Sequence, residues 1–427
     1  MQRQKIKRQN YLKLGITVSI VSVLSVLMAF SLKHITEYVE HYILRFTKVN
    51  FNYLFIFLPT IGITAIYFLR KYVFFNRKNK GITEVYKTLD DRKDHLPFFK
   101  IPSHYINGFL TVAFGGSTGI EVSTVVYTAA IGNQVYEKEF SARRYKRELI
   151  CAGVTAGVAI LFASPLAGFF FAMEVIARKV RGTLLYSCGL SALISGVFVY
   201  FFDNTRILPF IVEGWKWYAM PFFILLSLFG GALSVYFTLL VTRMKFLFNK
   251  ITNNFIRVNL GALTVGVMLF FFPVLYGDSY QGMYEVIQDA STVQVFSLLS
   301  LLLLALLKPL AASLTLGAGG DGGVFAPSIV AGAFLGLLFA TVCNQFFTME
   351  LSMLNFALVG AAATLSASIY APLTTLLLVC NLLPNGFDLF VPILIASLVA
   401  NTFSKILLPY NVYSYHRYLE NKNRVTV

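Results

Sequence analysis

The sequence predicts an all-α integral membrane protein whose helices are interrupted inside the bilayer. Hydrophobic residues make up 57% of the 427 residues, charged residues make up 13%, and the mean hydropathy is +0.68. A soluble domain usually carries about 25% charged residues, and half that density cannot cover the surface of a soluble particle of this size. Long uncharged runs indicate membrane-spanning helices, and the glycine-rich and proline-containing breaks inside them indicate that several helices stop within the membrane.

The uncharged runs are long enough to cross a membrane, which takes about 20 largely apolar residues. We expect membrane helices within 14–32, 49–69, 101–120, 149–173, 182–202, 217–242, 258–277, 290–307, 322–349 and 351–387. The longest of these runs have room for two elements. The first run has a basic flank and no small-residue cleavage site, so we expect it to remain in the protein as a first helix.

The net charge of +16 is concentrated between the apolar runs. Basic residues precede the first run, crowd the 70–100 loop and recur near the C-terminus, so the positive-inside rule predicts that both termini and this loop are cytoplasmic. The acidic 276–289 loop is expected outside, whereas the charges of 137–147 do not place that loop. Nucleic-acid binding is excluded because no polar domain is long enough to present the charge.

The four cysteines and five histidines give no sign of metal, redox or catalytic chemistry. Each cysteine stands alone in an apolar stretch, as expected of a small buried hydrophobic residue. The histidines are scattered and match no metal-ligand spacing, and no nucleophile is paired with a base. We therefore expect no metal, no cofactor and no enzymatic activity.

The breaks belong to an internal repeat. Gly116, Gly119 and Gly132 precede Gly320, Gly323 and Gly336 by 204 residues each. Gly153, Ala156, Pro165 and Leu166 precede Gly360, Ala363, Pro372 and Leu373 by 207 residues each. Each half thus contains a glycine-rich break, an apolar helix, a Pro-Leu break and a second apolar helix. Interrupted helices at equivalent places in two halves indicate a binding site where the halves meet.

Two breaks have the chemistry of an anion site. Gly119-Ile120-Glu121-Val122-Ser123 leads into an expected helix over 124–135, and Gly323-Val324-Phe325-Ala326-Pro327 leads into one over 328–340. The first N–H groups of a helix have no intrahelical partner, and that end of the helix dipole is positive. Such an end binds an anion without a full positive charge, and therefore weakly enough to release it.

Glu121 interrupts an uncharged stretch from Ile101 to Tyr136. A charged carboxylate at mid-membrane costs on the order of 2.5–3.5 kcal/mol, whereas its gain from the helix dipole at an exposed site is only about 0.3–1 kcal/mol. A functional role for Glu121 is therefore favoured over a purely structural one.

Five short motifs occur in a characteristic order. They are Gly119–Ser123, Pro165–Gly168 (Pro-Leu-Ala-Gly), Gly323–Pro327 (Gly-x-Phe-x-Pro), Ala371–Thr374 (Ala-Pro-Leu-Thr) and Tyr413 within Val-Tyr-Ser. In this order and spacing they resemble the CLC chloride channels and chloride/proton antiporters over nearly the whole chain. The resemblance implies a CLC-type inverted-repeat fold with broken, re-entrant helices, and a homodimer with one pore in each subunit.

The resemblance also assigns roles. Glu121 would be the gate, displaced or protonated to let anions pass. Val324 and Phe325 would donate backbone N–H groups to the anion, and Tyr413 would donate its hydroxyl. Gly119, Ile120, Gly323 and Lys80 complete the expected anion-binding set.

Two departures from the family pattern bear on function. Lys80 stands where the family has an anion-coordinating serine, and it either draws anions into the cytoplasmic vestibule, alters anion preference at an inner site, or is an ordinary member of the basic loop. Val175 stands where antiporters carry an inner glutamate, with Glu174 one position earlier. One residue rotates a side chain by about 100° around an α-helix, so Glu174 is not expected to replace it.

The sequence therefore predicts a single transmembrane domain over 1–427, with repeat halves 1–205 and 206–427 and no C-terminal regulatory domain. We expect passive conduction of chloride across the plasma membrane, gated by Glu121. The alternatives are chloride/proton antiport and selectivity for another anion such as fluoride or nitrate.

Overall fold

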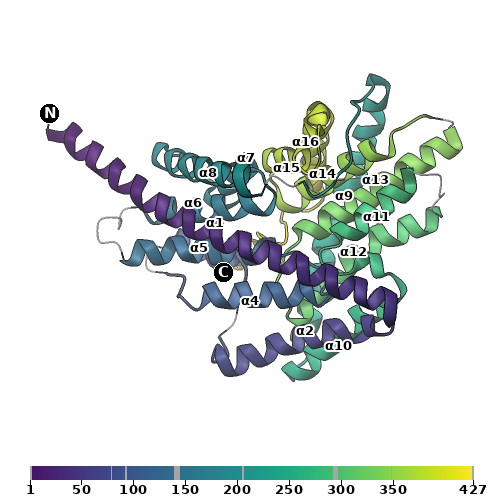
Figure 1. The fold of residues 1–427 in the computed structure, drawn as a ribbon, viewed down its shortest axis with the longest axis horizontal. Helices are drawn as coiled ribbons and strands as arrows, with labels where there is room; N and C mark the ends of the chain where they lie inside the picture. Colours follow the sequence, from purple (N-terminus) through teal and green to yellow (C-terminus); the bar gives the residue numbers. More distant parts are fainter. Residues whose placement is uncertain are drawn as a thin grey trace. The chain divides into compact units, whose positions relative to one another are not determined.

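The structure is a computed structural model that describes residues 2–77, 79–91, 94–138, 145–203, 206–291, 297–347 and 349–425. Within these ranges the regular structure is helical, apart from one isolated backbone bridge. Figure 1 shows the helices of the chain in sequence colours. The chain forms two compact units. Unit 1 comprises Met1–Ile35, Asn79–Ile106 and Glu121–Arg206, and unit 2 comprises Thr36–Lys78, Asn107–Ile120 and Ile207–Val427. Residues 139–144, within the loop that the charge pattern left unplaced, lie outside the described ranges.

The first helix is much longer than the predicted run over 14–32. Helix α1 (Gln2–Asn50) has 49 residues, which at about 1.5 Å per residue exceeds twice the roughly 30 Å thickness of a bilayer core. Charged residues after position 32 ended the predicted run, but the structure buries some of them with partners. Lys33, for example, is 5% exposed, and its Nζ lies 2.8 Å from the Asp203 carboxylate. A paired charge does not interrupt a helix in a packed interior.

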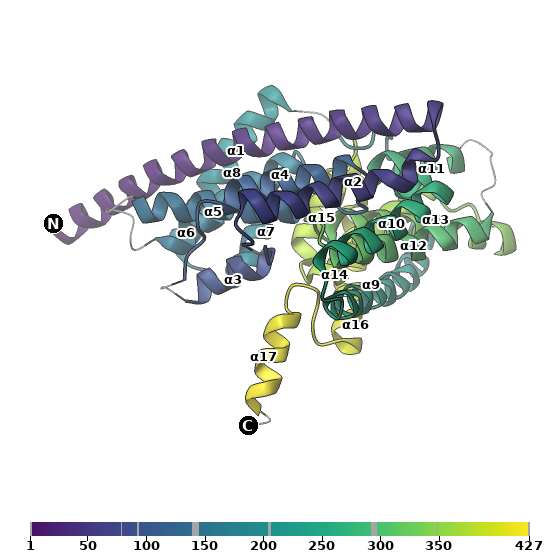
Figure 2. The same ribbon diagram turned by 90° about the horizontal axis from the view of Figure 1, so that it is seen from below.

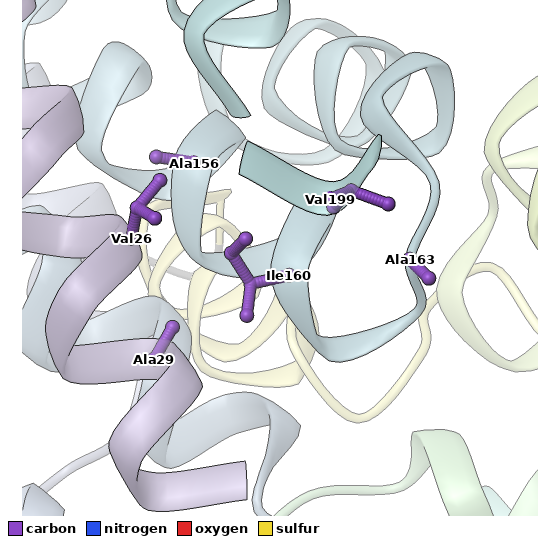
Figure 3. Close-up of a cluster of buried hydrophobic side chains, with 6 residues drawn as sticks. All are labelled: Val26, Ala29, Ala156, Ile160, Ala163 and Val199. Atoms are coloured by element: carbon purple, nitrogen blue, oxygen red, sulfur yellow. The ribbon is translucent and has the colours of Figure 1, made fainter. Parts of the chain in front are cut away.

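Unit 1 is built around helix α6 and contains part of α1 and part of α4. Its elements are α3 (Ile82–Asp90), α4 (Lys100–Ala113), α5 (Glu121–Lys138), α6 (Lys146–Leu161), α7 (Pro165–Phe171), a π-helix (Ala172–Ala177) and α8 (Gly182–Phe202). Helix α6 packs against α5, α7 and α8. Figure 3 shows small and branched side chains meeting in one of its buried clusters. The cluster contains Val26, Ala29, Ala156, Ile160, Ala163 and Val199.

Unit 2 is built around helix α14, which packs against α9, α13 and α16. Its α-helices include α2 (Leu54–Phe68), α9 (Met220–Asn249), α10 (Asn254–Phe271), α11 (Tyr280–Ser291), α12 (Leu298–Ala318), α13 (Phe325–Phe347), α14 (Met353–Ile369), α15 (Pro372–Cys380), α16 (Phe390–Leu407) and α17 (Tyr415–Val425). A π-helical turn (Leu69–Val73) and short 3₁₀ turns at 217–219, 273–275 and 386–389 complete it. Helices α2 and α10 lie side by side, and α17 extends away from the other helices of this unit (Figure 2).

Glycine- and proline-containing breaks divide several of the predicted runs. The helix in the 101–120 run ends at Ala113, and the 149–173 and 351–387 runs each contain two helices. Helices α5 and α13 begin at Glu121 and Phe325, earlier than the predicted starts at 124 and 328. A first helical turn needs no intrahelical acceptor for its N–H groups, so it accommodates both a leading carboxylate and Pro327.

The two repeated segments have matching local structures. Glycines at corresponding positions bring α5 against α6 and α13 against α14, because a Cβ added at Gly132 or at Gly336 would lie 2.3 Å or 2.0 Å from a carbonyl oxygen of the facing helix. Further on, Ala163 and Tyr370 both adopt left-handed backbone conformations, with φ of 46° and 58°. Each is followed, two residues later, by the proline that begins a short helix, α7 or α15.

The α-helical geometry expected around Glu174 and Val175 was wrong. Both residues lie in the π-helical turn Ala172–Ala177, so a rotation of about 100° per residue does not apply there. Val175 is nevertheless buried, whereas Glu174 is partly exposed.

Candidate anion site at the helix breaks

The two glycine-rich breaks meet in unit 2. Gly119 and Gly323 form an isolated antiparallel bridge, in which the Gly323 N–H donates to the Gly119 carbonyl at 3.2 Å. A Cβ at the neighbouring Gly322 would lie 2.2 Å from Thr118 Oγ1, so no larger residue fits this contact. Two segments some 200 residues apart in sequence therefore present their backbones to one another.

The expected anion donors of unit 2 directly follow the two bridged glycines in the sequence, and they are buried. Ile120, Val324 and Phe325 are at most 9% exposed. Because α13 begins at Phe325, the N–H groups of its first turn have no acceptor within the helix. The ring of Tyr413, which is 6% exposed, lies with its centroid 6.4 Å from that of Phe325. The structure thus brings Gly119, Gly323, Phe325 and Tyr413 into one region of unit 2.

Tyr413 is held by a turn with side-chain caps. Asn411 Oδ1 accepts the N–H groups of Tyr413 and Ser414 at 3.1 Å and 2.9 Å, and the Ser414 hydroxyl accepts the Asn411 N–H at 2.9 Å. The hydroxyl of Tyr370 lies 2.8 Å from the Leu408 carbonyl and 3.0 Å from the Tyr410 carbonyl. The segment that carries Tyr413 is therefore fixed from within and from the end of α14.

Glu121 belongs to unit 1, where it is the first residue of α5 and 3% exposed. It follows Ile120 directly in the chain. The N-terminal position places the carboxylate at the positive end of the α5 dipole. The next residue, Val122, lies near Gly81 in the same unit. A Cβ added at Gly81 would be 3.6 Å from Val122 Cγ1.

Lys80 has an exposed side chain in unit 1, and its backbone N–H is engaged. That N–H donates to Glu84 Oε1, whose carboxylate also forms a salt bridge of 2.7 Å with Lys100 Nζ. Lys100, which is 4% exposed, donates in addition to Asn79 Oδ1 at 3.2 Å. The Glu84 carboxylate thus accepts the Lys80 backbone N–H just before α3 and pairs with Lys100. The family motifs gave no sign of this network.

The sequence analysis also missed Lys308, a fully buried lysine in the interior of α12. Its ammonium donates to Ser117 Oγ, two residues before the first break, at 2.9 Å. The available signal was a lysine that ends the uncharged run over 290–307, 15 residues before Gly323. Among the described residues, no group of three or more histidine, cysteine or acidic side chains has the arrangement of a metal site.

Comparison with known proteins agrees with this arrangement. Residues 61–405 match the family described as "Voltage gated chloride channel". The chain is 27% identical over 338 residues to the "H(+)/Cl(-) exchange transporter ClcA" of Yersinia pestis bv. Antiqua (strain Angola), which covers 77% of this chain and 70% of that relative.

Solved structures share the fold. A structure described as that of a CLC-type fluoride/proton antiporter superposes with a TM-score of 0.78 at 23% identity, covering 94% of this chain and 97% of the other. The structure of a slow cyanobacterial Cl⁻/H⁺ antiporter gives a TM-score of 0.77 at 19% identity, covering 97% and 99%. These matches give the chain the CLC-type fold with its broken helices.

The family match spans most of the chain, and the helices are those of a multi-pass membrane protein. The chain belongs to the voltage gated chloride channel family, the CLC family of anion transport proteins.

Proposed function

We propose that this protein exchanges chloride, or a related anion, for protons across the membrane. The observation that carries the proposal is the buried carboxylate of Glu121 at the first position of α5, two residues after the Gly119–Gly323 bridge. In this proposal backbone N–H groups at the breaks, with Tyr413, bind the anion, and Glu121, at the positive end of α5, is the gate. A carboxylate that must move or be protonated to admit an anion is also able to carry a proton.

Exchange is favoured over the passive conduction that the sequence analysis expected. That expectation depended on Val175, which cannot carry protons and is buried in the π-helical turn. The relatives, in contrast, are named as proton/chloride exchange transporters or described as antiporters. Passive conduction remains the second candidate because of Val175, and the two differ in whether a chloride gradient drives protons.

The deciding experiment uses purified protein in sealed liposomes with a chloride gradient and no proton gradient. We expect chloride movement to drive protons uphill. Glu121→Gln should abolish the proton movement and flatten the pH dependence of anion flux, whereas Glu213→Gln, at an exposed carboxylate, should change neither. Chloride flux that never moves protons would establish passive conduction, and unaltered transport in Glu121→Gln would remove the gating role.

The anion itself requires a separate measurement. Lys80 replaces the serine of the family pattern, and a fluoride/proton antiporter is among the proteins of similar fold. Calorimetric competition of chloride, fluoride and nitrate for the purified protein ranks the three anions. We expect chloride to bind most tightly, and tighter binding of fluoride or nitrate would reassign the substrate.

We further propose a homodimer in the plasma membrane with both termini in the cytoplasm. The basic residues at the N-terminus, in the 70–100 loop and near the C-terminus support this orientation by the positive-inside rule.

A further inference from the structure

Lys308 is a buried cation in the middle of a membrane helix. It is 0% exposed, and α12 continues for ten residues on either side of it. Its ammonium donates three hydrogen bonds, to Ser117 Oγ at 2.9 Å, to the Gly277 carbonyl at 2.9 Å and to Ser279 Oγ at 2.7 Å. Because an intramembrane charge is costly, its retention calls for a role beyond helix packing.

Helix α12 holds Ser117 at two points. Lys308 donates to the serine hydroxyl, and Thr315 Oγ1 accepts the serine N–H at 3.1 Å. Positions 308 and 315 are seven residues apart and therefore lie on one face of the helix. The serine hydroxyl in turn donates to the Leu275 carbonyl at 2.9 Å, so the side chain and the backbone of Ser117 are both fixed.

Ser117 connects this contact to both breaks. It lies two residues before Gly119, whose carbonyl accepts the Gly323 N–H, and four residues before Glu121. Thr315 is also joined to the second break, because its carbonyl accepts the Gly320 N–H at 3.0 Å. A displacement of Ser117 would therefore shift the first break against the second.

Two acidic side chains, those of Glu40 and Asp278, interact electrostatically with Lys308. Glu40 of α1 is 7% exposed, and its Oε1 accepts the Asp278 N–H at 3.3 Å. The same oxygen fills the space beside Gly277, where an added Cβ would lie only 1.8 Å away. Burial raises the pKa of the Asp278 carboxyl, although the Tyr280 N–H and the Lys308 ammonium oppose the rise.

We propose that Lys308 is a positioning residue for anion binding, which holds the first glycine-rich break against the second through Ser117. The inference rests on the proposed anion site and adds a specific residue to it. Lys308 acts through Ser117 and has no direct contact with the anion in this role. Its bond to Ser279 serves as an internal comparison, because Ser279 accepts from the same ammonium but lies outside both breaks.

The test compares two variants that each remove one hydroxyl from the same ammonium. Ser117→Ala and Ser279→Ala are measured by calorimetric titration of chloride into the purified protein and by thermal unfolding in detergent. We expect both variants to lose a similar amount of thermal stability. Ser117→Ala should raise the chloride Kd about tenfold, whereas Ser279→Ala should change it less than twofold. Lys308→Met should raise the Kd at least as much as Ser117→Ala.

Each outcome is decisive. Equal chloride affinities for Ser117→Ala and Ser279→Ala would overturn the positioning role and leave Lys308 a structural residue, even if Lys308→Met fails to fold. A wild-type protein that binds no chloride, fluoride or nitrate would overturn the proposed anion site and this inference together. If the wild type binds chloride and Ser117→Ala weakens that binding more than Ser279→Ala does, both the anion site and the positioning role are supported.

Discussion

At the scale of single residues, Tyr370 shows how a strained backbone is used in this protein. It has a φ of 58°, a conformation that costs of order 1–3 kcal/mol for a bulky residue unless its surroundings hold it. Its side chain provides such a hold, through the Leu408 and Tyr410 carbonyls and the Lys405 ammonium, which lies 5.1 Å from its ring centroid. Ala163, at the equivalent place in the other repeat, has no side chain that reaches so far. Tyr370 is therefore suited to fix the segment that carries Tyr413.

This predicts a measurable coupling between the two tyrosines. Tyr370→Phe keeps the ring but removes a hydroxyl, whose hydrogen bond is worth about 0.5–1.5 kcal/mol. We expect a severalfold weaker chloride affinity by calorimetry. Tyr413→Phe should weaken affinity more, and the double variant should resemble Tyr413→Phe alone, because Tyr370 acts through Tyr413. Additive losses would mean that Tyr370 has an independent effect.

The limits of sequence reasoning are clearest at these residues. Glu121, Gly119 and Gly323 were predicted because their signals are local, namely a charge in an apolar run and glycines before a helix. Lys308 was not assigned, since its partner Ser117 lies 191 residues away and becomes a neighbour only after folding. The Glu84–Lys100 contact was also missed, because the charges of the 70–100 loop were read together for their sign and not for their pairing.

At the scale of helices, glycine sets the distances between the most closely packed pairs. Gly360 of α14 faces the Gly332 carbonyl of α13, where an added Cβ would lie at 2.3 Å. Gly153 of α6 has the same relation to the Thr128 carbonyl of α5, also at 2.3 Å. Small residues allow this approach in membrane proteins, where packing and not the hydrophobic effect drives helix association. The repeat spacing in the sequence therefore reflected a packing requirement.

Gly360→Ala is accordingly expected to destabilise the protein. The added methyl group meets a backbone oxygen that cannot rotate away, and overpacking of this kind costs about 1–3 kcal/mol. The measurement is the free energy of unfolding in detergent micelles. Gly182→Ala is the matched control, since nothing lies within 4 Å of its added Cβ at the start of α8. Equal stability of the two variants would contradict the packing role.

The element boundaries that were predicted poorly share a physical cause. The uncharged-run criterion ended the first helix near position 32, although α1 continues to Asn50. It treats every charge as an interruption, but Lys33 is neutralised by Asp203 at the end of α8. The sequence around a charged residue does not show whether a distant element supplies an opposite charge. Helix breaks made by glycine and proline are therefore predicted more reliably than breaks inferred from charge.

At the scale of the whole molecule, an apolar groove on unit 1 bears on the proposed dimer. The groove has a volume of about 640 Å³ and lies along α7 and α8. Its lining includes Gly189, Ala192 and Gly196 on one face of α8, beside Leu193, which is 69% exposed. A row of small residues next to protruding leucines is the surface on which membrane helices associate closely. A twofold partner presenting the same surface would fill the groove with its own side chains.

Filling the groove is therefore expected to prevent dimerisation. Gly189→Trp places a large side chain where an added Cβ would meet no neighbouring atom within 4 Å, so the subunit itself should tolerate it. Single-molecule photobleaching of labelled protein in liposomes should then show mainly one bleaching step, against two for the wild type. Leu260→Trp, at a position of α10 that is 53% exposed, should leave two steps. Two steps for Gly189→Trp would place the dimer contact elsewhere, whereas one step with retained chloride flux would mean that each subunit contains a complete pathway.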